Sequence, residues 1–80
     1  MTDTGYHIRE RFPEKVSDLS TLMAEDPAFF DLCEDYDVCM DALQYWTQSE
    51  VPEARDRVDE YRHIARELEN EIARALTLQK

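Results

Sequence analysis

The sequence contains few of the residues that interrupt regular structure. Its 80 residues include one glycine and three prolines, too few for the many tight turns of an all-β chain. No stretch approaches the 18 consecutive apolar residues of a membrane-spanning helix, and the first residues show no apolar run typical of a signal peptide. We therefore expect a helical, cytoplasmic protein that makes no direct contact with a membrane.

Basic residues are missing from a long central stretch. No Lys or Arg lies between Val16 and Ala54, and the formal net charge of the chain is −10. Coulomb repulsion makes nucleic acid and anionic membranes poor partners for such a chain. We expect no direct nucleic-acid binding, and a basic protein partner rather than an acidic one.

The sequence has two cysteines, Cys33 and Cys39. On one helix their Cα atoms would be about 9 Å apart, which is too far for a disulfide. They form no Cys-x-x-Cys motif, and neither has a histidine at helical spacing. Because zinc and redox sites need such arrangements, we expect two reduced, packed thiols and no cofactor.

The dominant pattern is an apolar stripe with alternating steps of three and four residues. Its members are Val51, Ala54, Val58, Tyr61, Ala65, Leu68, Ile72 and Ala75. This pattern predicts one long helix with a covered face. At 1.5 Å per residue the helix would be roughly 40 Å long, so it needs a second helix along it.

A second stripe with the same spacing supplies that helix. It consists of Phe29, Leu32, Tyr36, Cys39, Leu43 and Trp46, and is widened by Cys33 and Met40. The connection from Thr47 to Glu50 is short, so the two helices must run antiparallel as neighbours. Ser49 or Thr47 is expected to cap the last helix. Its arginines, Arg62 and Arg66 among them, are expected to reach the acidic second helix.

Two prolines mark the remaining helix boundaries. Pro13 suits the first turn of a leading helix, and Asp26-Pro27 ends that helix and starts the next. The predicted fold class is all-α: a short leading helix followed by a long, coiled-coil-like antiparallel α-helical hairpin. The predicted segments are a flexible tail over 1–12 and a hairpin domain over 13–78 with helices at about 13–25, 27–47 and 50–77. The tail residues Tyr6, Ile8 and Phe12 could dock on the body of the hairpin.

Several motifs resemble the small bacterial YdcH-like family. They are Pro13-Glu14, the helix with Leu19 and Met23, Asp26-Pro27-Ala28-Phe29, the positions Leu32, Tyr36 and Leu43, and Leu68-Glu69-Asn70-Glu71-Ile72. The resemblance spans roughly residues 13–76. It implies a self-associating helical hairpin of bacterial origin, and it carries over no catalytic residues. Met40 and Ala42 depart from the acidic residues expected there, and Cys39 replaces an expected Leu.

Glu60 and His63 form a Glu-x-x-His motif, the spacing used by ferritin-like carboxylate proteins to bind metals. Asp35 or Asp37 on the facing helix could complete such a site. The apolar register instead places Glu60 and His63 at outer positions, where a metal would need a second hairpin. We interpret them as a solvated pair and predict no metal site.

The second helix carries an acidic cluster of Asp31, Glu34, Asp35, Asp37 and Asp41. A calcium loop needs a turning backbone with glycine, whereas these residues lie on a regular helix. The cluster is interpreted as a solvated face. The functional alternative is an acidic surface that docks on a basic protein or imitates nucleic-acid phosphates.

Three large apolar residues, Phe30, Val38 and Tyr45, fall outside the second stripe, with Trp46 nearby. A polar outer face would not carry so many, so more than one side of this helix should be covered. The leading helix can cover part of it. The rest is predicted to be a protein-interaction surface for a second copy or another protein.

No arrangement of residues indicates catalysis. Ser17, Ser20 and Ser49 lie in no nucleophile motif, and His7 lies in the predicted tail. The sequence therefore predicts a non-enzymatic helical interaction or structural protein that self-associates. The alternatives are an acidic regulator on a basic protein surface and a metal-binding oligomer that uses Glu60 and His63.

Overall fold

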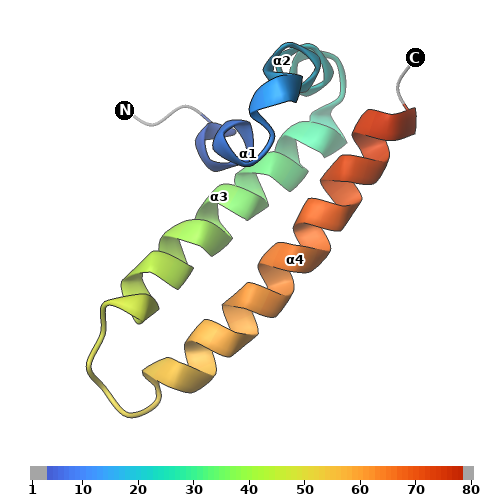
Figure 1. Ribbon diagram of the computed structural model, residues 1–80. Helices are drawn as coiled ribbons and strands as arrows, with labels where there is room; N and C mark the ends of the chain where they lie inside the picture. Colours follow the sequence, from blue (N-terminus) through green and yellow to red (C-terminus); the bar gives the residue numbers. More distant parts are fainter. Residues whose placement is uncertain (1–3, 79–80) are drawn as a thin grey trace.

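A computed structural model describes residues 4–78 as a helical hairpin with two short helices packed against one end. The elements are α1 (Tyr6–Arg11), the 3₁₀ turn η1 (Pro13–Lys15), α2 (Val16–Glu25), α3 (Pro27–Thr47) and α4 (Ala54–Leu78). Figure 1 shows α3 and α4 antiparallel, with α1 and α2 near the end away from their connecting loop. The predicted all-α hairpin is confirmed.

Asp26 determines where α3 begins. Its carboxylate accepts the backbone N–H of Ala28 at 3.0 Å and that of Phe29 at 3.3 Å. Pro27 occupies the first turn, where its missing N–H leaves no hydrogen bond unmade. The predicted range 27–47 agrees with the observed helix.

The start of α4 differs from the prediction. The helix begins at Ala54 rather than near residue 50, and Val51 is 46% exposed instead of lying in the seam. The Ser49 hydroxyl accepts the Val51 N–H at 3.4 Å within the loop, so it does not cap α4. Thr47 belongs to α3, where its hydroxyl donates to the Leu43 carbonyl.

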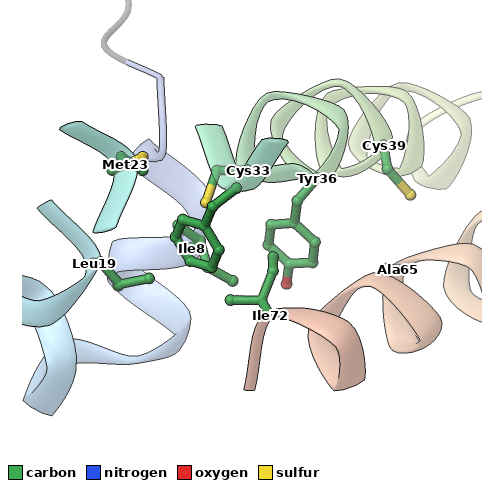
Figure 2. Packing of buried hydrophobic residues seen from close by; sticks show 9 residues of the cluster. Ile8, Leu19, Met23, Cys33, Tyr36, Cys39, Ala65 and Ile72 are labelled. Carbon is green, nitrogen blue, oxygen red and sulfur yellow. The ribbon is translucent and has the colours of Figure 1, made fainter. Parts of the chain in front are cut away.

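The predicted seam between the long helices is confirmed by burial. Tyr36 and Cys39 on α3 are buried, as are the small Ala65 and the larger Ile72 on α4 (Figure 2). The Cys39 thiol donates to the Tyr61 carbonyl of α4 at 3.3 Å. Such a contact requires close approach of the two helices, which small residues permit.

The expectation that Arg62 and Arg66 form ion pairs with α3 across the seam is wrong. Within residues 4–78 no ion pair joins Arg62 or Arg66 to the acidic residues of α3. Arg57 pairs instead with Glu60 of its own helix at 2.9 Å. Apolar burial, rather than charge pairing between these residues, therefore holds α3 against α4.

Within the predicted tail over 1–12, Tyr6–Arg11 form the helix α1 rather than a flexible segment, and Ile8 docks on the body as the sequence analysis allowed; residues 1–3 lie outside the described range. Ile8 is fully buried and packs in one core cluster with Cys33 and Ile72 (Figure 2). The physical reason is that two helices bury only one seam. The side of α3 that carries Cys33 needs a further cover, which α1 and α2 provide.

Gly5 is required where the chain enters α1. Its φ is +91°, in the region that L side chains rarely adopt. A Cβ at this position would lie 2.9 Å from the terminal methyl of Met23. The only glycine in the chain thus allows the backbone to turn closely beneath α2.

We expect replacement of Ile8 by Ala to lower the free energy of unfolding by about 2–5 kcal/mol, because it leaves a cavity in the core. Urea unfolding followed by circular dichroism measures the change. Tyr6→Ala is the matched control, since Tyr6 lies on the same helix but is 52% exposed. Equal stabilities of the two variants would contradict the docking of α1.

Candidate functional site

The outer edge of α3 carries two exposed apolar side chains. Val38 is 65% exposed and Tyr45 is 66% exposed. They lie seven residues apart, which places them on one side of the helix two turns apart. Because Phe29, Tyr36 and Cys39 are buried on the opposite side, the register of the seam directs Val38 and Tyr45 toward solvent.

Phe30 and Trp46 lie in different surroundings from that pair. Phe30 is only 37% exposed, and its helical position is closer to Asp37, on the side of α3 that α1 covers. Trp46 is partly buried at the border of the seam. Its ring contacts Tyr45 edge to face, with 5.1 Å between ring centroids. The four predicted interaction residues therefore form one exposed pair and two flanking residues.

Most of the acidic cluster is exposed, as predicted. Asp31, Glu34, Asp35 and Asp41 are exposed, whereas Asp37 is partly buried. The residues Asp31, Glu34, Val38, Asp41 and Tyr45 follow steps of three and four and share one side of α3. We name these five residues the outer α3 edge.

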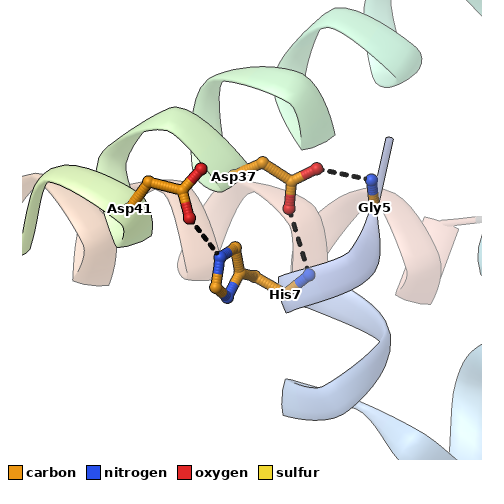
Figure 3. A network of polar contacts seen from close by, with 4 residues as sticks. All are labelled: Gly5, His7, Asp37 and Asp41. Atoms are coloured by element: carbon orange, nitrogen blue, oxygen red, sulfur yellow. Dashed lines mark hydrogen bonds and ion pairs between the residues drawn. The ribbon is translucent and has the colours of Figure 1, made fainter. Parts of the chain in front are cut away.

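Asp37 has a structural role that the sequence did not predict. Its carboxylate accepts the N–H of Gly5 at 2.6 Å and the N–H of His7 at 3.1 Å (Figure 3). These donors belong to the first turn of α1, which has no capping side chain of its own because Gly5 is its N-cap. The His7 ring also contacts Asp41, with 2.9 Å between Nε2 and Oδ1. Asp37 thus caps α1 from another helix.

Tyr36 belongs to a polar cluster that links α3, α4 and α1 through the Glu69 carboxylate. Its hydroxyl donates to Glu69 of α4 at 2.5 Å, and Glu69 also pairs with Arg11 of α1 at 3.3 Å. Burial raises the pKa of Tyr36, and the hydrogen bond to Glu69 raises it further. The phenol is therefore a neutral donor that satisfies the one polar atom of a buried side chain.

The two cysteines are free, buried thiols, as predicted. Burial raises the pKa of Cys33 to about 11, and the nearby Asp37 carboxylate adds to the shift. Burial also raises the pKa of Cys39. Because the thiolate is the nucleophile and the metal ligand, both groups are unreactive near neutral pH.

Glu60 and His63 do not form a common site. Glu60 pairs with Arg57 at 2.9 Å, and His63 pairs with Glu67 at 3.3 Å. All four side chains are at least half exposed. In residues 4–78 no group of three His, Cys, Asp or Glu side chains is placed to hold a metal ion.

An open groove of about 620 Å³ lies beside the loop between α3 and α4. Trp46 and Val58 form apolar parts of its wall, and Arg55 and Arg62 form charged parts. None of the charged or polar side chains described along its wall is buried. The groove therefore lacks the preorganised polar group that a specific small-molecule site needs, and we assign no ligand to it.

Sequence reasoning missed the contacts that fix α1. The signal for them is weak, because Asp37 and Gly5 are more than 30 residues apart and no local pattern connects them.

None of the helices over residues 4–78 has a segment long and apolar enough to cross a membrane.

Comparisons with protein-family models, with curated proteins and with solved structures find no match to this chain. The resemblance to the YdcH-like family therefore stays a prediction, and the function is argued from the surfaces described above.

We expect Tyr36→Phe to lower the free energy of unfolding by about 1.5–3 kcal/mol, because a hydrogen bond to a charged carboxylate is lost from the core. Urea unfolding of the variant gives this value. Tyr45→Phe serves as the control, since Tyr45 is exposed and its change should be close to zero. A Tyr36→Phe variant as stable as the control would remove the proposed role of the hydroxyl.

The raised pKa of Cys33 predicts an alkaline loss of stability. Between the ordinary thiol pKa of 9.0 and the raised pKa of about 11, the unfolded state loses its proton while the folded state keeps it. The free energy of unfolding should therefore fall as the pH rises through this window, by up to about 3 kcal/mol from this group. Unfolding at a series of pH values should show a shallower decline for Cys33→Ala than for the wild type. Identical slopes would show that Cys33 does not titrate in this way.

Proposed function

We propose that this chain is a non-enzymatic helical interaction protein whose outer α3 edge binds a basic, partly apolar helix of another protein. The observation that carries the proposal is the exposure of Val38 and Tyr45, 65% and 66%, among acidic neighbours on a helix without a single Lys or Arg.

The apolar pair supplies the affinity in this proposal. Burying a large apolar side chain is favourable by about 1.5–3 kcal/mol. Val38 and Tyr45 lie two turns apart, so a helix laid along α3 can cover both with residues on one of its faces. Tyr45 also offers a hydroxyl at the edge of such a contact, and tyrosine is enriched at protein interfaces for this reason.

The charges supply the selectivity for a partner. Asp31, Glu34 and Asp41 lie on the same side as the apolar pair, so Lys or Arg side chains of a partner meet opposite charge. A second copy is a poor occupant of this edge. In a two-fold contact the same surface faces itself, which would bring the acidic residues of both copies together.

The non-enzymatic part of the proposal rests on the chemistry of the reactive groups. Burial keeps the Cys33 and Cys39 thiols protonated, and the exposed His63 ring contacts Glu67 rather than a nucleophile. The acidic-regulator alternative uses the same edge but relies on charge alone. It predicts binding that survives loss of the apolar pair.

A synthetic amphipathic peptide of Leu and Lys tests the proposal, with Trp46 fluorescence as the readout because its ring contacts Tyr45. We expect the peptide to bind, and the double variant Val38→Ser/Tyr45→Ser to bind at least about tenfold more weakly. Added salt should weaken the complex, because it screens the attraction between opposite charges.

Two controls distinguish specific binding at this surface from non-specific binding by an acidic protein. Ile64→Ser removes an apolar side chain of α4 that is 42% exposed, and it should leave the affinity unchanged. A peptide with Glu in place of Lys should not bind. The proposal is wrong if the wild type does not bind the Leu/Lys peptide, and the acidic-regulator alternative is favoured if the double variant binds as tightly as the wild type.

A further inference from the structure

The short helix α1 reaches the outer α3 edge through the ring of His7. Its Nε2 lies 2.9 Å from Oδ1 of Asp41, one of the five residues of that edge (Figure 3). The His7 side chain is 18% exposed, whereas the Asp41 side chain is 72% exposed. One oxygen of Asp41 thus contacts α1, while the rest of the carboxylate stays open to solvent.

The surroundings of His7 hold its ring in this position. The backbone N–H of His7 donates to Asp37 of α3 at 3.1 Å, and the next residue, Ile8, is fully buried in the core. The Tyr6 ring packs edge to face against the His7 ring, with 5.3 Å between ring centroids. The ring is therefore fixed against Asp41 by contacts of its backbone and of both neighbouring residues.

The contact with Asp41 requires a proton on Nε2 of His7. An ionised carboxylate only accepts hydrogen bonds, so the ring nitrogen that faces it must donate. Two states of the ring meet this condition: the neutral tautomer with its proton on Nε2, and the imidazolium. Both states keep the contact, but they differ by one positive charge beside Asp41.

We propose that His7 is a pH-dependent regulator of the outer α3 edge, because its protonation places a positive charge against Asp41 and weakens binding of the basic partner. This inference rests on the proposed function of that edge and adds the condition under which the edge binds. Histidine ordinarily changes its charge between pH 5 and 8, whereas carboxylates and the basic groups of a partner ordinarily keep theirs. The edge should therefore bind its partner more tightly near pH 8 than near pH 5.5.

Several charged or titratable groups surround His7. Asp37 and Asp41 face it from α3, and Tyr6 contacts its ring within α1. The further charged residues on α1, on the turn η1 that follows it, and on α4 where it meets α1 are Arg9, Glu10, Arg11, Glu14, Lys15 and Glu69. Of all these groups only Asp41 belongs to the outer α3 edge, so it is the group through which a change in the charge of His7 reaches that surface.

The size of the effect follows from the charges of the edge. Asp31, Glu34 and Asp41 are its three carboxylates, and only Asp41 contacts the His7 ring. With His7 protonated, Asp41 already has a cationic neighbour, so a Lys or Arg of the partner gains less by meeting it. Loss of one exposed ion pair lowers the affinity roughly two- to fivefold, so protonation should weaken the complex without abolishing it.

Binding of the Leu/Lys peptide at pH 8 and pH 5.5 tests the inference, with Trp46 fluorescence as the readout. We expect the wild type to bind roughly two- to fivefold more weakly at pH 5.5 than at pH 8. His7→Gln should lose most of this difference, because glutamine is polar but does not titrate. His63→Gln is the matched control, since His63 is the other histidine of the chain and contacts Glu67 on α4. It should keep the pH dependence of the wild type, and circular dichroism at both pH values checks that the variants are folded.

A double-mutant cycle with Asp41→Asn identifies the carboxylate through which His7 acts. We expect Asp41→Asn to bind the peptide more weakly than the wild type at pH 8, and to show no further effect of His7→Gln at pH 5.5. Such non-additivity is expected of two groups that act through their mutual contact. If His7→Gln changes the affinity at pH 5.5 by the same factor with and without Asp41→Asn, the inference is wrong.

The outcomes separate this inference from the proposed function on which it rests. A wild type that does not bind the peptide at pH 8 overturns both. If the wild type binds at pH 8 but shows the same pH dependence as His7→Gln, the inference alone is overturned and the outer α3 edge keeps its proposed partner. Loss of the pH dependence in His63→Gln also overturns the inference, because the titrating group would then lie on α4.

Discussion

The buried hydroxyl of Tyr36 is the constraint on which the arrangement of the helices depends. The side chain is 1% exposed, so its hydroxyl needs a partner within the protein, and Glu69 provides it. Sliding α4 by one turn would move Glu69 about 5.4 Å and leave a buried donor unsatisfied, at a cost of about 1–3 kcal/mol. Apolar stripes with a regular period tolerate such a slip far better. The hydrogen bond therefore fixes the register that the stripes alone leave open, and Arg11 ties α1 to the same carboxylate.

The sequence predicted the parts of the fold that depend on local or periodic signals. Asp26-Pro27 is a complete helix start within four residues, and the stripe from Ala54 to Ala75 repeats often enough to define one helix face. The short helix α1 has fewer than two turns, which is too little for a period to be recognised. Its cap comes from Asp37, a distant residue whose carboxylate replaces the side chain that Gly5 lacks. The late start of α4 was missed because Pro52 is equally compatible with a helix start and a turn.

The candidate surface was predicted only in part, because it too depends on contacts between segments that are far apart in the sequence. The apolar register placed Val38 and Tyr45 outside the seam, and both are exposed. That register describes only one partner for α3, whereas α1 and α2 provide a second. Phe30 and Asp37 lie toward this second contact, so neither is as exposed as a hairpin alone would leave it. Their surroundings depend on how segments far apart in the sequence pack, which helical spacing does not specify.

Burial is unevenly distributed along the hairpin, and the end near the loop has the thinner core. Ile8, Leu19 and Met23 complete the core near Cys33 and Ile72, at the end where α1 and α2 pack. Toward the loop the hairpin has no third layer, and Leu43, Trp46, Val58 and Tyr61 are only partly buried. Regions with fewer buried apolar contacts open more readily than the rest of a fold.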